Sequence, residues 1–415
     1  MRATKLNLLL TGVAVAGGLL AGCSRAQTNS GMATGGSKAD VRVSLSAYGL
    51  PADFFQSAAE RCAREIIGYR FVVWLNSDSV VVGFNTSPNC RPSPSQMVHG
   101  MARILAFDVS GHLKASRDLP YEADGDGIVV ADGEAKAGPA GTLLFRVQEL
   151  HQSKSGILLL DANLKDAGQV NRFLEQTTFL EHALVFQEGF TISGPRTYSV
   201  LSGSPIKEAA RWKQDWPVGT MDRKFGEHEI AYMLCQQELR PNEYGSSNVV
   251  YAGAKRRCAM IVETDDQKGW MTTLEQDSSG EIIGVLGDGS VIGHISVRGS
   301  RSGRLVIWAK DQAPKTLPWI PGNYCGSVES ATADMSRYAV FASDACNDMG
   351  GLFRLLGVGH DGTDRGRWIV FDRRSPTPIA DRVFPKNARA DLSPDGSRYA
   401  TFEAGELRIY LLPKQ

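Results

Sequence analysis

The sequence lacks the motifs of the common catalytic and nucleotide-binding sites. It has no Gly-x-Ser-x-Gly nucleophile turn, no His-Glu-x-x-His zinc motif, no Walker phosphate loop and no dinucleotide-binding fingerprint. The Ser-x-x-Lys match at Ser204 and Lys207 lies in a turn without its partner motifs, so we interpret it as a chance match. The sequence therefore predicts no catalytic residue and no cofactor-binding residue.

Metal-ligand spacings are missing as well. No two cysteines form a Cys-x-x-Cys pair, and none of the seven histidines lies two or four residues from another. The acidic glycine-containing stretches at residues 124–127 and 361–364 lack the spacing of a calcium loop and read more simply as turns. No metal site is predicted.

Long runs of basic residues are also absent. The chain balances 45 Lys and Arg against 45 Asp and Glu, and the only basic residues among the first 22 are Arg2 and Lys5. Nucleic acid is therefore not expected as a partner. The 44 glycines and 18 prolines are typical of many short strands joined by tight turns.

The one long apolar run is at the N-terminus. Arg2 and Lys5 precede a charge-free stretch over residues 6–20, and Leu20-Ala21-Gly22-Cys23 follows. A membrane-spanning helix needs about 20 apolar residues, and this run is shorter and contains glycines. The pattern resembles the bacterial lipoprotein signal. The resemblance implies removal of residues 1–22 and attachment of diacylglycerol and fatty acids such as palmitate at Cys23, with an ordinary cleaved signal peptide as the alternative.

Several acyl chains on one residue give stable membrane anchoring. In such lipoproteins Ser24, rather than Asp, favours the outer over the inner membrane, so the resemblance implies a location in the cell envelope, facing the periplasm or the surface. Residues 23–38 are small and polar without periodicity, which predicts a flexible tether.

Six of the seven cysteines remain once Cys23 is set aside, and an even number fits an oxidising compartment. Their spacing favours pairs between neighbours in the sequence, although other pairings stay open. The candidate disulfides are Cys62–Cys90, Cys235–Cys258 and Cys325–Cys346.

The beginning of the mature chain predicts one strand and one helix. Residues 40–47 alternate apolar and polar side chains, as a strand does. Residues 51–67 carry an apolar stripe at helical spacing, with Pro51 suited to the first turn and Gly68 to the C-terminal cap. We expect an amphipathic helix there.

From Gly68 onward nearly every segment reads as a short strand. The strands fall into groups of about four, with periods of about 45 to 60 residues, which is the size of a propeller blade. The best-defined group is the last, residues 391–412. Its turn Ser393-Pro394-Asp395-Gly396 leads into two alternating strands.

Segments of the last group recur. Residues 334–341 match residues 395–402 at most positions, and residues 108–111 and 277–280 look like eroded copies of the turn. The turn and the strands after it resemble the repeat of TolB-type propellers, relatives of the WD-repeat family. The resemblance implies an architecture and says little about function.

The expected fold is an all-β propeller that occupies residues 39–415 as one domain. Seven blades are favoured, with six or eight open. The last group is short of a strand and residues 40–47 have no partner, so we expect the N-terminal strand to complete the C-terminal blade.

Location and architecture leave several functions open. The favoured one is an envelope lipoprotein whose propeller is a binding or scaffold module for a protein, a glycan or another envelope component. The alternative is an envelope enzyme of hydrolase or lyase type with its site at the mouth of the propeller channel, and a third possibility is a structural role in envelope assembly. The long segments 86–100, 189–196 and 237–248 are the candidate binding loops.

Overall fold

The computed structural model describes most of the chain that follows the proposed tether. The described residues are 39–52, 54, 70–86, 98–123, 136–149, 154–170, 173–177, 184–188, 196–202, 206–214, 216, 220–226, 228–237, 256–264, 269–274, 278–297, 303–319, 325–343, 366–384 and 388–414. The predicted signal, the tether with Cys23, nearly all of the predicted helix and most of the three candidate binding loops lie outside them.

Seven four-stranded antiparallel sheets are formed by the described residues. The first sheet contains β2 (Arg70–Asn76), β3 (Ser79–Asn85), β4 (Val98–Asp108) and β5 (Leu113–Ala123). The second contains β6 (Lys136–Ala137), β7 (Leu143–Glu149), β8 (Lys154–Leu160) and β9 (Asp166–Val170), and a short 3-10 helix, η2 (Pro139–Gly141), lies between β6 and β7 in the chain. The third contains β10 (Phe173–Thr177), β11 (Leu184–Glu188), β12 (Arg196–Ser202) and β13 (Lys207–Gln214).

The remaining sheets follow the same order along the chain. The fourth contains β14 (Thr220–Phe225), β15 (Glu229–Gln237), β16 (Arg256–Thr264) and β17 (Trp270–Thr273). The fifth contains β18 (Ser278–Val285), β19 (Val291–Val297), β20 (Arg304–Trp308) and β21 (Lys315–Leu317). The sixth contains β22 (Cys325–Ala331), β23 (Arg337–Ser343), β24 (Gly366–Asp372) and β25 (Ala380–Phe384). The seventh contains β26 (Arg389–Leu392), β27 (Arg398–Glu403), β28 (Glu406–Leu411) and β1 (Val41–Ser44).

Apolar side chains join each sheet to the next. Val82 and Phe84 of the first sheet pack with Phe402 and Ile409 of the seventh, and five more buried clusters join other neighbouring pairs. The second and third sheets meet through β8 and β10. Because the last sheet packs on the first as well as on the sixth, the sheets close on themselves. The all-β propeller predicted from the sequence is confirmed, and the blade number of the whole chain stays a prediction.

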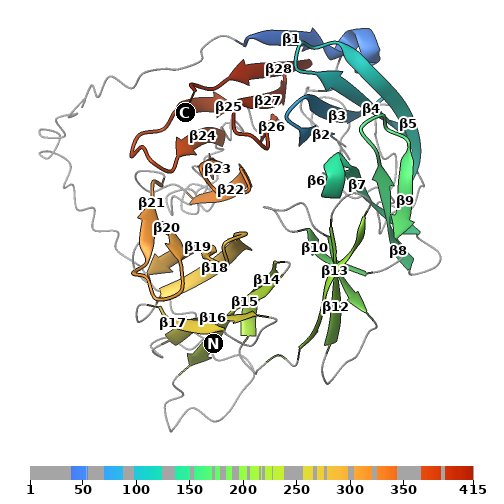
Figure 1. Cartoon of the computed structure of the whole chain (residues 1–415). Helices are drawn as coiled ribbons and strands as arrows, with labels where there is room; N and C mark the ends of the chain where they lie inside the picture. The colour runs from blue at the N-terminus through green and yellow to red at the C-terminus, as the bar shows by residue number, and fades with distance from the viewer. Residues whose placement is uncertain are drawn as a thin grey trace, which may run out of the picture. The chain divides into compact units, whose positions relative to one another are not determined.

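Closure uses the two ends of the described chain. Figure 1 shows β1 beside β28, and the two strands pair antiparallel with Val41 opposite Ile409 and Val43 opposite Leu407. This confirms the predicted closure by an N-terminal strand. The strand is shorter than the predicted range 40–47, because Leu45 turns into the interior and opens a 3-10 helix, η1 (Leu45–Tyr48).

Two strands expected from the sequence, over residues 249–252 and 353–358, lie outside the described residues. Among the described residues β15 pairs directly with β16, β23 pairs directly with β24, and β14 supplies the fourth strand of its sheet. A single strand expected over residues 170–174 is wrong in its bounds, because β9 ends at Val170 and β10 begins at Phe173.

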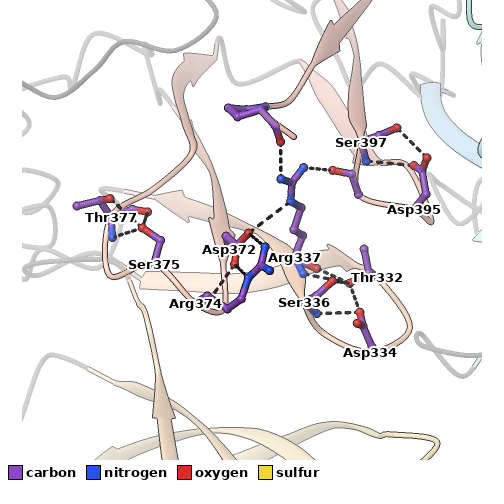
Figure 2. A network of polar contacts seen from close by, with 12 residues as sticks. Thr332, Asp334, Ser336, Arg337, Asp372, Arg374, Ser375, Thr377, Asp395 and Ser397 are labelled. Carbon is purple, nitrogen blue, oxygen red and sulfur yellow. Dashed lines mark hydrogen bonds and ion pairs between the residues drawn. The ribbon is translucent and has the colours of Figure 1, made fainter. Parts of the chain in front are cut away.

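The repeated turn of the sixth and seventh sheets is confirmed. In the turn between β26 and β27, the Ser393 hydroxyl donates to Asp395 at 2.6 Å and accepts the N–H of Arg398 at 2.9 Å. In the turn between β22 and β23, Thr332 donates to Asp334 at 2.8 Å and accepts the N–H of Arg337 at 3.1 Å. Figure 2 shows Thr332, Asp334 and Ser336 of the turn between β22 and β23, and Asp395 with Ser397 of the turn between β26 and β27.

The other two proposed copies of this turn are wrong. Gly111 closes a turn that joins β4 to β5, the third and fourth strands of their sheet, whereas the Ser393 turn joins the first and second. Gly280 lies inside β18. A short Asp-x-x-Gly match is satisfied by any tight turn that uses an aspartate acceptor, so it does not identify a position in the blade.

Candidate functional site at the closure of the ring

When the closing strand β1 is set aside, the strand that comes first along the chain in each sheet is here called its first strand, and it is irregular in most of the described sheets. An extra residue interrupts the pairing of five of the seven, namely β2, β10, β14, β18 and β22. A bulge of this kind takes backbone N–H groups out of the ladder. Those groups then need acceptors from elsewhere.

Polar side chains of a neighbouring first strand supply some of these acceptors. The Asp391 Oδ2 atom on β26 accepts the N–H of Trp74, which precedes the extra residue of β2, at 2.8 Å. The Asp222 Oδ2 atom on β14 accepts the N–H of Ile282, which precedes the extra residue of β18. Two junctions thus use one device, an aspartate that caps the bulge of the next sheet.

Among the carboxyl groups described where the last sheet meets the first, Asp391 has the largest shift in pKa. Its Oδ1 atom accepts the N–H of Leu392 at 2.9 Å, and the Trp74 indole N–H donates to the Asp391 backbone carbonyl at 3.2 Å. Some of the residue reaches the surface, but the carboxyl group is enclosed by β2, β22 and β26, and this burial raises the pKa of Asp391 to about 7. Hydrogen bonds from Trp74 and Ser330 oppose the rise of the pKa, and the like charge of Glu329 adds to it.

Arg337 holds the C-terminal end of the chain against the sixth sheet. Its side chain is 3% exposed, and its Nη1 atom donates to the Gly396 carbonyl at 2.6 Å while Nη2 donates to the Pro413 carbonyl (Figure 2). The Asp372 carboxylate is 3.8 Å from Nε and is shared with Arg374. Burial lowers the pKa of the Arg337 guanidinium.

A second buried charge lies in the closing sheet. The Glu403 Oε1 atom accepts from Arg408 at 3.0 Å and from Arg382 of the sixth sheet at 3.1 Å. The Tyr410 hydroxyl also donates to it, at 3.2 Å, and the Arg382 guanidinium lies over the Tyr410 ring. Glu403 therefore joins the sixth and seventh sheets by charge as well as by shape.

An aromatic cluster lies between the third and fourth sheets. Trp216 donates its indole N–H to the Tyr198 hydroxyl at 2.8 Å, and the Arg223 guanidinium lies 5.3 Å from the centre of the Trp216 ring. Tyr232 donates to Glu263 at 2.7 Å. The polar groups of this cluster are paired with one another. We therefore interpret the cluster as part of the packing between the two sheets rather than as a binding site.

One predicted disulfide falls within the described residues. Cys235 and Cys258 face each other on β15 and β16 and are bonded, with both side chains buried in the core of the fourth sheet. Cys325 begins β22. Cys23, Cys62, Cys90 and Cys346 lie outside the described residues, so lipidation and the other two pairings stay predictions.

Three arginines on β24 and just after it are bonded to neighbouring acidic residues or to their backbone. Arg367 forms an ion pair with Asp381, and Arg374 with Asp372. Arg373 donates to the Asp334 carbonyl at 3.3 Å. Within the portion of the chain that the structure describes, no three acidic, histidine or cysteine side chains are grouped to hold a metal ion. The same portion contains no helix with the length and apolar character needed to cross a membrane.

Sequence reasoning missed Asp391, Glu403 and Arg337 as buried groups. All three are charged residues in strands, and a charged residue in an alternating strand is ordinarily placed on the solvent side. The available signal was the repeat itself. A strand packed between two neighbouring sheets has no solvent face, so polar residues inside the best-defined repeat had to be buried and paired.

Several solved structures are similar to the chain, at low sequence identity. No protein-family model matches the chain, and no curated protein matches it in sequence. The β-propeller domain of the trilobed protease from Pyrococcus furiosus is similar in structure, with 12% identity, a TM-score of 0.46 and coverage of 84% of this chain and 96% of that one. TolB from Acinetobacter baumannii is 10% identical over 76% of this chain and 77% of its own, with a TM-score of 0.37. An acylaminoacyl peptidase from Pyrococcus horikoshii is 10% identical over 82% of this chain and 52% of its own, with a TM-score of 0.45.

Proposed function

We propose that the chain is a lipid-anchored protein of the cell envelope, attached to the outer membrane, whose propeller is a binding or scaffold module for a protein, a glycan or another envelope component. The observation that supports this most is the place of β1. The strand that follows the proposed tether is the outer strand of the closing sheet, so a chain anchored at Cys23 would enter the propeller there.

The disulfide supports the compartment. Disulfides persist in oxidising environments such as the periplasm and are rare in the cytosol. Cys235 and Cys258 are paired on adjacent strands, as expected for an exported protein. The balanced charge of the sequence gives no support for a nucleic-acid partner.

Lipidation is tested by replacing Cys23. We expect C23A to abolish incorporation of labelled palmitate and to release the protein from the membrane fraction. S24A is the matched control and should keep both. S24D should move the protein from the outer to the inner membrane fraction. Unchanged palmitate labelling of C23A would contradict the proposed anchor.

The binding role is tested separately in intact cells. Photo-crosslinking residues placed in the segments 86–100, 189–196 and 237–248 should capture a discrete protein or glycan, with one face of the propeller preferred. The same residue types placed on the outer strand β17 serve as the control. Equal and diffuse labelling from loops and outer strand would contradict a dedicated binding face.

One observation favours the enzyme alternative. A carboxyl group with a pKa of about 7 is suited to general acid–base chemistry, and Asp391 lies on a first strand. Its two oxygens already accept the N–H groups of Trp74 and Leu392, which fits a structural role better. Hydrolysis or elimination of an envelope glycan or peptide that disappears in D391N, while the variant remains folded, would decide for the enzyme.

A further inference from the structure

A group of three buried polar atoms lies where β24 and β25 of the sixth sheet face β27 of the seventh. These atoms, here called the unpaired donors, have no hydrogen-bond partner in the part of the chain that the structure describes. They are the indole Nε1 of Trp368, the Nη1 of Arg382 and the hydroxyl of Tyr399. We propose that they bind one small monovalent anion of the size of chloride. This inference rests on the fold and does not depend on the proposed anchor or partner.

Arg382 is the neighbour of both other residues. Trp368 on β24 lies directly opposite Arg382 on β25, so the two side chains share one face of the sixth sheet. The Arg382 guanidinium lies 4.4 Å from the centre of the Tyr410 ring, on which the Tyr399 ring stacks with the ring centres 4.5 Å apart. Trp368 and Tyr399 are buried in the same apolar cluster, with exposures of 3% and 1%. The three donors therefore belong to one place between two sheets.

The carboxylate that Arg382 binds already accepts several hydrogen bonds. Glu403 Oε1 accepts from Arg382 Nη2, and the same oxygen accepts from Arg408 and Tyr410. Two guanidinium groups thus share one buried carboxylate, and the second carboxylate bonded to Arg408, that of Glu406, is only half-buried. The interior of this contact therefore holds more positive than negative charge, and Nη1 of Arg382 is left to donate elsewhere.

The chemistry of the donors favours an anion over a water molecule. An indole N–H and a guanidinium donate hydrogen bonds and accept none. Burial raises the pKa of the Tyr399 hydroxyl, with Arg382 opposing the rise, so the hydroxyl keeps its proton and also donates. A water molecule in this place would need acceptors for its own two hydrogens. A halide ion accepts from all three donors and supplies the negative charge that the two arginines lack.

The chain offers a matched control for this proposal. The indole Nε1 of Trp212 on β13 is also buried without a partner. Among the residues that the structure describes, the third sheet holds no second side-chain polar atom of this kind. Replacing Trp212 by Phe therefore removes the same chemical group as replacing Trp368 by Phe, but away from any set of unpaired donors.

The first experiment measures urea unfolding of the full chain in non-ionic detergent by circular dichroism, with sodium chloride replaced stepwise by sodium gluconate at constant ionic strength. An ion bound only by the folded protein should lower the unfolding equilibrium constant roughly tenfold for each tenfold rise in chloride above its Kd. We expect this response in the unsubstituted protein and in W212F, and a much smaller one in W368F and Y399F. Equal chloride responses in W368F and W212F would overturn the proposal.

The measurements in gluconate alone separate loss of the ion from loss of the fold. Without chloride, W368F should be at least as stable as the unsubstituted protein, because it removes a buried N–H that has no partner. A W368F variant that is clearly less stable in gluconate would show that the indole N–H is satisfied by the protein itself, which would also contradict the site.

The second experiment locates the ion. Crystals of the unsubstituted protein soaked in sodium bromide should give one anomalous scattering peak within hydrogen-bond distance of Trp368 Nε1, Arg382 Nη1 and the Tyr399 hydroxyl. Density for water alone at this place would contradict the proposal. A bromide peak in a protein whose stability does not respond to chloride would mean an adventitious ion only, and would contradict it as well.

Discussion

At the scale of single residues, the closure depends on buried charged side chains that form hydrogen bonds with backbone groups. Arg337 is the clearest case, because two of its N–H groups satisfy the Gly396 and Pro413 carbonyls while its ion pair with Asp372 is long. Removing the guanidinium would leave two carbonyl groups without donors in a place that water hardly reaches.

We therefore expect R337M to lower the free energy of unfolding by about 3 kcal/mol, since methionine fills similar space but donates nothing. The measurement is equilibrium urea unfolding. R374M is the matched control. It also removes a guanidinium bound to Asp372, but from an exposed position, and should leave the urea midpoint nearly unchanged. Similar losses from both variants would show that the shared Asp372, not the backbone carbonyls, carries the effect.

Residue-level patterns predicted turns better than they predicted burial. Ser393 and Asp395 predict their turn because short polar side chains next to Pro and Gly form hydrogen bonds with the nearby backbone, which favours turns. Glu403 and Thr401 alternate with apolar residues as a solvent-facing row would, yet they are 5% and 0% exposed because both faces of β27 are covered. Alternating polar and apolar residues predict a strand with two different faces, but they do not show whether either face is exposed to solvent.

At the scale of elements, the hairpin between β27 and β28 carries avoidable backbone strain. Ala404 and Gly405 both have positive φ, +50° and +80°, as the two-residue turn of a tight hairpin requires. Glycine adopts this conformation freely, whereas for alanine it costs about 1 kcal/mol.

Asn at the first of these positions should relieve the strain. We expect A404N to raise the free energy of unfolding by about 0.5 to 1 kcal/mol, because Asn-Gly suits this turn and the Ala404 side chain is exposed. A404S is the control and should give no gain. A loss of stability in A404N, measured by the shift of the urea midpoint, would argue against the turn geometry described above.

The disulfide in the fourth sheet joins β15 to β16 across a sequence separation of 23 residues. Replacing Cys235 and Cys258 together by Ser or Ala should lower the free energy of unfolding by about 3 kcal/mol, as for the loss of a cross-link closing a loop of this length. Thermal unfolding with and without a reductant checks this. The reductant should destabilise the unsubstituted protein more than the double variant, by the contribution of this one bond. A reductant effect of equal size in both would place the stabilising bond at another cysteine pair.

At the scale of the whole molecule, the ring is held together by side-chain packing between sheets and by the N-terminal strand β1, which pairs with the C-terminal strand β28. Its architecture could be predicted from the sequence for two reasons. The strand groups recur at the spacing of propeller blades, and the strand at residues 40–47 needs a hydrogen-bonding partner that the incomplete last group can supply. The cross-sheet caps of Asp391 and Asp222 could not, since bulges arise from the register between strands and leave no periodic trace.

A covalent bond across the closure should stabilise the entire ring. Ser44 lies opposite Glu406 in the pairing of β1 with β28, so S44C/E406C places two thiols on facing positions. On oxidation we expect the urea midpoint to rise, by up to about 4 kcal/mol in unfolding free energy. S46C/E406C, in which the first residue lies beyond the paired strand, is the control. A bond that forms without raising the midpoint would show that the ring does not open at β1 when it unfolds.

The four-residue length of β1 has a mechanical consequence if Cys23 carries the anchor. Any tension between membrane and propeller would pass along the tether and act first on the contacts of Asp40 with β28, where its N–H donates to the Ile409 carbonyl at 3.0 Å and its Oδ2 atom accepts the N–H of Leu411 at 2.7 Å. Pulled from that end, antiparallel pairs separate in succession rather than all together, which requires comparatively little force. A short closing strand would thus make the ring yield at a defined place, and a stretched envelope could expose the edge of β28 while the other sheets stay intact.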